Sequence, residues 1–117
     1  TMLITGDLAF FYDSNAFLNN HLPEGFKVIV INNQGGDVFR RLPMASNSKL
    51  FDSHFIWKHN RSVKNLVSYA GLEYFYAASI DDWKNIWLNF IESPKSSVLE
   101  VITDSSINDE MWNHRFQ

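Results

Sequence analysis

Four consecutive branched apolar residues, Val-Ile-Val-Ile at positions 28–31, constrain the fold of this chain more than any other feature. A strand with one face in water alternates apolar and polar residues, whereas a strand buried on both faces is apolar throughout. Strands of the second kind are typical of parallel sheets that carry helices on both sides. The run stops at Asn32 and is followed by Asn-Gln-Gly-Gly, a composition typical of a loop.

Strands and helices are predicted to alternate along the rest of the chain. Asp7 stands where it could cap the helix that follows the first strand. A segment without clear periodicity, residues 43–60, reads as a long surface segment. The predicted strands are residues 2–5, 28–31, 74–78 and 97–103, and the predicted helices are 8–22, 37–42, 62–69, 81–91 and 108–116. This order predicts an α/β fold with a mainly parallel sheet flanked by helices.

Composition limits the classes of function. The chain has 117 residues, enough for one domain, and a net charge of -3. Its scattered basic residues disfavour nucleic acid as a partner, and the absence of cysteine excludes disulfides and thiolate metal sites. No apolar run approaches the ~20 residues of a membrane helix, and no signal peptide is visible, so we expect a cytoplasmic protein. Because the first strand begins at once, we expect upstream sequence to be missing.

Two polar motifs follow neighbouring predicted strands. Gly6-Asp7 comes after the first strand and Asn32-Asn33 after the second. A β-α-β unit brings both strand ends to the same edge of the sheet, where open α/β sheets bind ligands. Oxygens of Asp7, of Asn33 and of a backbone carbonyl in the Gly35-Gly36 turn suit Mg²⁺, and free N–H groups of the following helix favour an anion. Taken singly, the same residues are also typical of a helix cap and a turn.

Other polar and aromatic residues carry weaker signals. The four histidines are scattered without metal-ligand spacing, which favours surface or hydrogen-bonding roles. Asp13 and Asn15 either face solvent or orient the loop of a metal site, and the sequence leaves both roles open. Trp57 is hard to place in a core. An apolar stripe on the helix at 81–91 is more typical of a core than of a binding surface; it consists of Trp83, Ile86, Trp87, Phe90 and Ile91.

The two motifs together resemble the Gly-Asp … Asn-Asn motif of thiamine-diphosphate enzymes. Most of that superfamily has Gly-Asp-Gly, whereas this chain has Leu8 in the third position. The stretches GDLAFFYDSN (6–15) and VINNQGGDVFRRLP (30–43) are similar to one branch, the 2-succinyl-5-enolpyruvyl-6-hydroxy-3-cyclohexene-1-carboxylate synthases of menaquinone biosynthesis. Residues 51–59, 69–72 and 98–101 fit the same branch, so the resemblance covers nearly the whole chain.

The resemblance implies a cofactor, a metal and a place in a longer enzyme. Residues 1–117 would be the C-terminal portion of the domain that binds the diphosphate of thiamine diphosphate. Asp7, Asn33 and the Gly35 carbonyl would bind Mg²⁺, and Val38, Phe39 and Leu42 would line the substrate pocket. The implied cofactor-binding residues are Gly6, Asp7, Leu8, Ala9, Asn33, Gly35, Val38 and Phe39.

The resemblance also implies the reaction. The family transferase decarboxylates 2-oxoglutarate and adds the product to isochorismate. Its catalytic glutamate and most substrate-binding arginines lie in other domains or in a second subunit of a homo-oligomer, so no catalytic residue is assigned here. This chain alone would be inactive.

Three alternatives stay open from the sequence. One is another thiamine-diphosphate decarboxylase or synthase, which Gly-Asp-Gly would have favoured. Another is a small flavodoxin-like or receiver-type module that binds Mg²⁺ without catalysis, although such modules usually carry an acidic pair and a late lysine. The last is a purely structural domain. If opening strands are missing, we expect an exposed apolar sheet edge and self-association.

Overall fold

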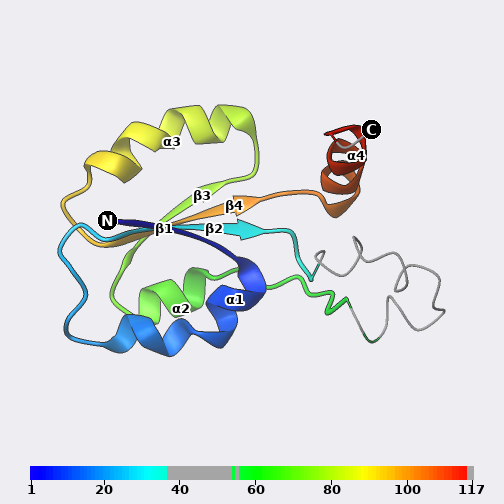
Figure 1. Cartoon of the computed structure of the whole chain (residues 1–117). Coiled ribbons are helices and arrows are strands. Elements are labelled where there is room, and N and C mark those ends of the chain that lie inside the picture. The colour runs from blue at the N-terminus through cyan, green and yellow to red at the C-terminus, as the bar shows by residue number, and fades with distance from the viewer. Residues whose placement is uncertain (37–53, 55, 116–117) are drawn as a thin grey trace. The chain divides into compact units, whose positions relative to one another are not determined.

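In the computed structural model, the chain divides into two compact units, and residues 1–36, 54 and 56–115 are described (Figure 1). The sheet unit comprises residues 1–32 and 62–102, and the second unit comprises residues 33–61 and 103–117. The predicted helix at 37–42 and most of the predicted surface segment at 43–60 lie outside the described residues.

The sheet unit is built on four parallel strands. They are β1 (Met2–Gly6), β2 (Lys27–Asn32), β3 (Glu73–Ala77) and β4 (Ser97–Ile102), in the spatial order β1-β2-β4-β3. Residue Ile29 of β2 lies opposite Ile4 of β1 and Leu99 of β4. The predicted α/β class with a parallel sheet is confirmed, and each strand lies within one or two residues of its predicted position.

Helices cover both faces of this sheet, as Figure 1 shows. On one face, Val28, Val30 and Val98 pack against α1 (Asp7–Tyr12), the 3₁₀ helix η1 (Ser14–Leu18) and α2 (Lys64–Tyr69). On the other face, Ile29 and Leu99 pack against α3 (Ile80–Glu92). Successive residues of β2 therefore point into two different cores, which explains why residues 28–31 are all apolar.

The single helix predicted for residues 8–22 is wrong. Helix α1 ends at Tyr12, and η1 follows after Asp13. The break coincides with Asp-Ser-Asn, residues whose side chains compete for backbone hydrogen bonds, and Ser14 Oγ donates to the carbonyl of Phe11 at 3.2 Å. The buried pair is Phe10 and Phe17, whose rings stack at 5.0 Å, whereas Tyr12 and Leu18 are exposed.

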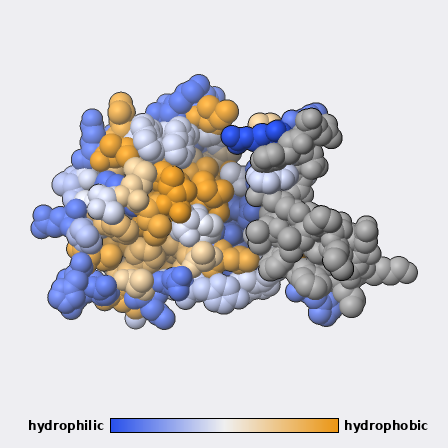
Figure 2. Space-filling model, viewed as in Figure 1, coloured by the Kyte–Doolittle hydropathy of each residue, from blue (hydrophilic) through white to orange (hydrophobic). Residues whose placement is uncertain are grey.

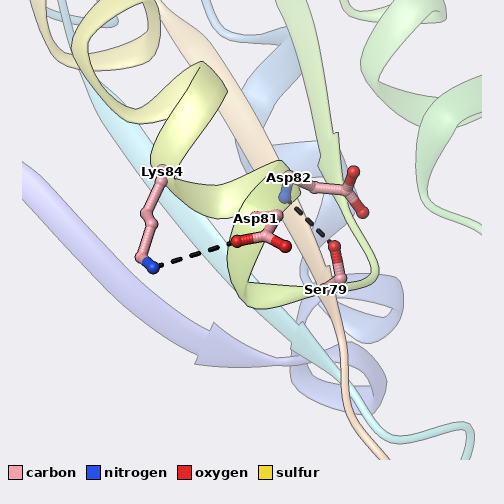
Figure 3. Close-up of polar contacts among 4 residues, drawn as sticks. All are labelled: Ser79, Asp81, Asp82 and Lys84. Carbon is pink, nitrogen blue, oxygen red and sulfur yellow. Dashed lines mark hydrogen bonds and ion pairs between the residues drawn. The ribbon is translucent and has the colours of Figure 1, made fainter.

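Helix α3 begins with a capping arrangement that the sequence signals. Ser79 Oγ accepts a hydrogen bond from the backbone N–H of Asp82 at 3.1 Å (Figure 3), and Asp82 Oδ2 accepts from the backbone N–H of Ala78 at 3.1 Å. Hydrogen bonds to the Asp82 carboxylate, from the Ser79 side chain first and then from the Ala78 N–H, hold the pKa of Asp82 below its usual value. Lys84 lies 3.8 Å from Asp81 on the exposed side of the first turn (Figure 3).

The apolar stripe of α3 faces the sheet, with one exception. Phe90 is fully buried, and Trp83 and Trp87 stack with ring centroids 4.8 Å apart. Ile91, which we predicted on the same face, is 37% exposed. The core interpretation of the tryptophan stripe is therefore confirmed, and the stripe is narrower than predicted.

A buried lysine stabilises the end of α3. Lys27, at the start of β2, donates through Nζ to the carbonyls of Ser93 at 2.7 Å and Lys95 at 2.8 Å and to Ser97 Oγ at 2.9 Å. These acceptors follow the last helical turn, where cations are favourable. Burial lowers the pKa of Lys27, and the nearby carboxylate of Glu73 partly opposes that shift.

Strand β1 leaves apolar side chains exposed at one edge of the sheet. It pairs only with β2, and Met2, Leu3 and Ile4 are exposed among the described residues. In Figure 2, orange side chains gather on the face along which β1 runs in the same view of Figure 1. The expected apolar edge is thus present, and unpaired apolar edges of this kind favour association.

The last helix, α4 (Ser105–Arg115), starts earlier than predicted. Asp104 Oδ1 accepts a hydrogen bond from the backbone N–H of Ser106 at 2.7 Å, which stabilises the first turn, and the bonds to Ser106 hold the pKa of Asp104 below its usual value. The helices in the described part of the chain are all too short or too polar to cross a bilayer.

Candidate functional site

Asp7 lies at the carboxyl end of β1, where its backbone passes from strand to helix. It is the first residue of α1, and Gly6 occupies the N-cap position, so the interpretation of Asp7 as the N-cap is wrong. Its side chain is only 3% exposed, and its Oδ1 accepts a hydrogen bond from the Leu8 N–H at 2.8 Å. A carboxylate is thus held inside the protein at a strand end, in a position that ordinary surface caps do not occupy.

The residues around Asp7 vary in exposure. Gly6 pairs with Ile31 of β2, so the ends of β1 and β2 lie at the same edge of the sheet. Gly6 and Ala9 are exposed, and Leu8 is half-buried. The edge predicted for ligand binding therefore exists, and Gly6, Asp7, Leu8 and Ala9 follow β1 there.

Asn33 directly follows β2 and belongs to the second unit, where it forms a tight turn. Asn33 Oδ1 accepts a hydrogen bond from the Gly35 N–H at 3.3 Å, and its carbonyl accepts one from Ser105 Oγ at 3.0 Å. Gln34 has a φ of 62°, and its carbonyl accepts from the His59 N–H at 3.0 Å. The left-handed residue of the turn is therefore Gln34 and not a glycine.

Gly35 is buried against residues 56–58 of the same unit. A Cβ atom added there would lie 3.4 Å from the Ile56 side chain and from the Trp57 carbonyl, which are ordinary contacts. Neither its backbone conformation nor its surroundings therefore require glycine.

The predicted site residues fall into different units. Asn33 and Gly35 lie in one turn, whereas Asp7 belongs to the sheet unit. The predicted pocket residues Val38, Phe39 and Leu42 lie outside the described residues. Among residues 1–36, 54 and 56–115, no three histidine, cysteine, aspartate or glutamate side chains lie close enough to share a metal ion.

Sequence reasoning missed a buried carboxylate in the middle of β4. Glu100 is 0% exposed, and four neutral donors meet its two oxygens. Asn32 Nδ2 and the Val63 N–H donate to Oε1 at 2.7 and 3.0 Å, and the hydroxyls of Ser62 and Tyr74 donate to Oε2, both at 2.6 Å. A signal was available, because a glutamate inside the otherwise apolar run Val-Leu-Glu-Val-Ile is unusual unless it has buried partners.

The same network explains an unusual phenol. Burial raises the pKa of Tyr74 well above its ordinary value, and its hydrogen bond to the Glu100 carboxylate adds to the shift. Ionising this phenol would remove the donated proton and place a second negative charge against a buried carboxylate. The hydroxyl of Tyr74 is therefore a permanent donor at neutral pH.

The raised pKa predicts how stability depends on pH. Above about pH 10, the ordinary tyrosine value, the unfolded chain releases the Tyr74 proton while the folded chain keeps it, so stability falls as pH rises. Chemical unfolding at pH 9 to 11.5 is expected to show a steeper loss for the natural chain than for Tyr74→Phe. Tyr69→Phe, at an exposed position, is the control and should leave the slope unchanged. Equal slopes in all three chains would contradict the prediction.

The remaining polar candidates are peripheral within the described part. His21 and His54 are exposed, and His114 Nε2 lies 4.0 Å from Glu110 on α4. His59 is half-buried beside Trp57, with ring centroids 5.9 Å apart. The Trp57 side chain is exposed, and the Arg61 guanidinium lies 5.3 Å from the centre of its ring.

Asp13 and Asn15, whose role the sequence left open, are both exposed.

Comparison with known proteins identifies close matches along almost the whole chain. The chain is 42% identical over 110 residues to a 2-succinyl-5-enolpyruvyl-6-hydroxy-3-cyclohexene-1-carboxylate synthase from Christiangramia forsetii, which covers 93% of this chain and 19% of that protein. Proteins of the same name from Flavobacterium psychrophilum and Flavobacterium johnsoniae are 39% and 34% identical over 93% and 99% of this chain, and 20% and 21% of their own lengths. No family model matches the chain.

These relatives share one name. The chain spans about a fifth of each relative that it matches. In this chain, the Gly6-Asp7 and Asn32-Asn33 motifs stand at neighbouring strand ends of the parallel sheet. The resemblance to the 2-succinyl-5-enolpyruvyl-6-hydroxy-3-cyclohexene-1-carboxylate synthases is therefore confirmed over about a fifth of their length.

Proposed function

We propose that this chain is the part of a thiamine-diphosphate-dependent synthase that binds the cofactor's diphosphate through Mg²⁺. One observation carries the proposal: Gly6-Asp7 and Asn32-Asn33 stand at the carboxyl ends of neighbouring parallel strands, in a chain up to 42% identical to synthases of this family. The reaction proposed for the whole protein is decarboxylation of 2-oxoglutarate followed by addition to isochorismate in menaquinone biosynthesis.

The chemistry of the available groups fits a hard cation. Asp7 offers a buried carboxylate, Asn33 an amide oxygen and Gly35 a backbone carbonyl, and oxygen ligands of mixed charge are those that Mg²⁺ binds. Gly6, Leu8 and Ala9 follow the same strand end and would approach the diphosphate. Val38, Phe39 and Leu42 would line the pocket for the reacting part of the cofactor and the substrate. When bound, thiamine diphosphate would supply the electron sink for decarboxylation.

The rest of the enzyme would come from outside these residues. No catalytic residue is proposed in this chain, and the activating glutamate and the substrate-binding arginines would belong to other domains or to a second subunit. The chain's share of about a fifth of its relatives and the exposed apolar edge of β1 support this division. The complete protein would be a cytoplasmic, homo-oligomeric transferase, and residues 1–117 alone would be inactive.

Calorimetry with thiamine diphosphate, with and without Mg²⁺, tests the proposal. Binding is expected only with Mg²⁺, and Asp7→Asn should weaken it by more than the roughly 10–100-fold that changes around metal ligands cost. Asp7→Ala should behave in the same way. Asp13→Asn, which changes an exposed carboxylate just beyond α1, is the matched control and should leave binding unchanged.

Circular dichroism of each variant would separate lost binding from lost folding. The measurement is made on residues 1–117 and on the longest natural form of the protein that contains them. Failure of the long form to bind thiamine diphosphate would refute the cofactor assignment. Mg²⁺ binding that Asp7→Asn abolishes but that thiamine diphosphate never strengthens would favour the Mg²⁺-binding module instead.

A further inference from the structure

The carboxylate of Glu100 meets both ends of one long segment of the chain. Residues 33–61, the first part of the second unit, leave the sheet unit after Asn32 and return to it at Ser62. Asn32 donates to Glu100 Oε1, and Ser62 and Val63 donate to Oε2 and Oε1. One side chain on β4 therefore binds the last residue before the segment and the first residues after it.

The hydrogen bonds leave this carboxylate little freedom. An ionised carboxylate accepts about four hydrogen bonds, and Glu100 receives four, three of them at 2.6–2.7 Å. All the partners are neutral within the part of the chain that the structure describes. Because Asn32 and Ser62 donate through short side chains and Val63 through its backbone N–H, the bonds define the positions of the main chain at Asn32 and at residues 62–63.

A purely structural explanation accounts for this arrangement less well. Burying a charge without an opposite charge costs free energy, and leucine in the same place would avoid that cost. The carboxylate instead constrains geometry, because the positions of its two oxygens determine where the four donors can lie. Of the hydrogen bonds from Asn32, Ser62 and Val63, those from Asn32 and Val63 are accepted by the same oxygen, Oε1.

We infer that Glu100 is a positioning residue for the metal-binding turn: by holding Asn32 and residues 62–63 together, it orients the segment that begins with Asn33 and Gly35. The inference rests on the proposed function, because the turn matters for Mg²⁺ only if Asn33 and the Gly35 carbonyl bind it. Asn32 thereby acquires a role distinct from that of Asn33.

Two variants and two controls test this inference in the longest natural form of the protein. Glu100→Leu removes every acceptor, whereas Glu100→Gln keeps one oxygen for Asn32 and Val63 and can donate to the two hydroxyls, which rotate freely. Tyr74→Phe removes the partner on β3, whose hydroxyl also lies 3.4 Å from Ser62 Oγ, and it leaves the bonds of Asn32 and Val63 to Oε1 in place. Phe90→Ala lowers stability from the opposite face of the sheet, so it controls for general destabilisation.

Hydrogen exchange of the Gly35 and His59 amides is measured without cofactor. The Gly35 N–H donates to Asn33 Oδ1, and the His59 N–H donates to the carbonyl of Gln34. Glu100→Leu is expected to exchange about 10-fold faster there, the change given by about 1.4 kcal/mol of lost local stability. Glu100→Gln should restore most of the protection. Equal acceleration in Phe90→Ala and Glu100→Leu would overturn the inference.

Calorimetry of Mg²⁺ at saturating thiamine diphosphate provides the second readout. Glu100→Leu should weaken Mg²⁺ binding about 10-fold, as the loss of a group that orients metal ligands does. Tyr74→Phe should change the Mg²⁺ affinity less than about twofold. Unchanged Mg²⁺ affinity in Glu100→Leu would refute the positioning role. If the natural protein binds no cofactor at all, the proposed function fails, and the exchange result then decides separately whether Glu100 orders the turn.

Discussion

Replacing Phe90 by alanine is expected to lower the free energy of unfolding by about 3–5 kcal/mol, the usual cost for a buried phenylalanine. Phe90 is fully buried on α3, packs with Ile29, Ala77 and Leu99, and meets Phe75 edge-on at 5.6 Å. The Lys27 ammonium also lies 5.6 Å from its ring. Truncation would therefore remove apolar burial and leave a cavity beneath a charged group.

Urea unfolding followed by circular dichroism measures this loss. Leu88→Ala is the matched control, because it removes a side chain of similar kind from the same helix at a position that is 63% exposed. The control should stay within about 0.5 kcal/mol of the natural chain. A loss below about 1 kcal/mol for Phe90→Ala would show that α3 does not pack on the sheet as described.

Replacing Glu100 by leucine is expected to cost about 3–5 kcal/mol, although it exchanges a buried charge for an apolar side chain of similar size. The hydroxyls of Ser62 and Tyr74 can turn toward other acceptors, but Asn32 Nδ2 and the Val63 N–H cannot, and each buried donor left without a partner costs about 1–3 kcal/mol. The penalty arises from the donors that remain and not from the lost carboxylate.

Comparison of three variants in the same unfolding experiment separates these effects. Glu100→Gln keeps the acceptor for both fixed donors, so we expect a loss of only about 1 kcal/mol. Tyr74→Phe removes one hydroxyl and should cost a similar amount. A Glu100→Leu chain as stable as the natural one would show that the network contributes nothing to folding.

Local pattern predicted most of the secondary structure because its signals are short-range. The apolar run of β2 indicated burial on both faces, and the helix predicted at 81–91 agrees with α3 to within one residue at each end. The left-handed Gly71 ended α2 where expected, with a φ of 71°. The long helix at 8–22 failed because its apolar spacing is compatible with one helix, while the hydrogen bond of Ser14 to Phe11 favours a break.

Sequence also predicted which residues stand at the ends of neighbouring strands, and the register of β1 and β2 agrees. It did not predict that Asp7 is buried, or that the left-handed residue of the turn is Gln34. Both features follow from tertiary packing around the strand ends. The residues next to Asp7 and Gln34 in the sequence do not reveal that packing. The roles of Asn33 and Gly35 stay predictions.

The sequence by itself determined the parallel α/β class and the Gly6-Asp7 and Asn32-Asn33 motifs. Runs of consecutive residues reveal both the burial of a strand and the polar groups at its end. Only the tertiary structure decided the role of Glu100, whose partners lie 26 to 68 positions away along the chain. A hydrogen bond between such distant residues depends on the sheet order β1-β2-β4-β3, which places β2 beside β4. The carboxylate of Glu100 and the amide of Asn32 become partners only when those two strands pair.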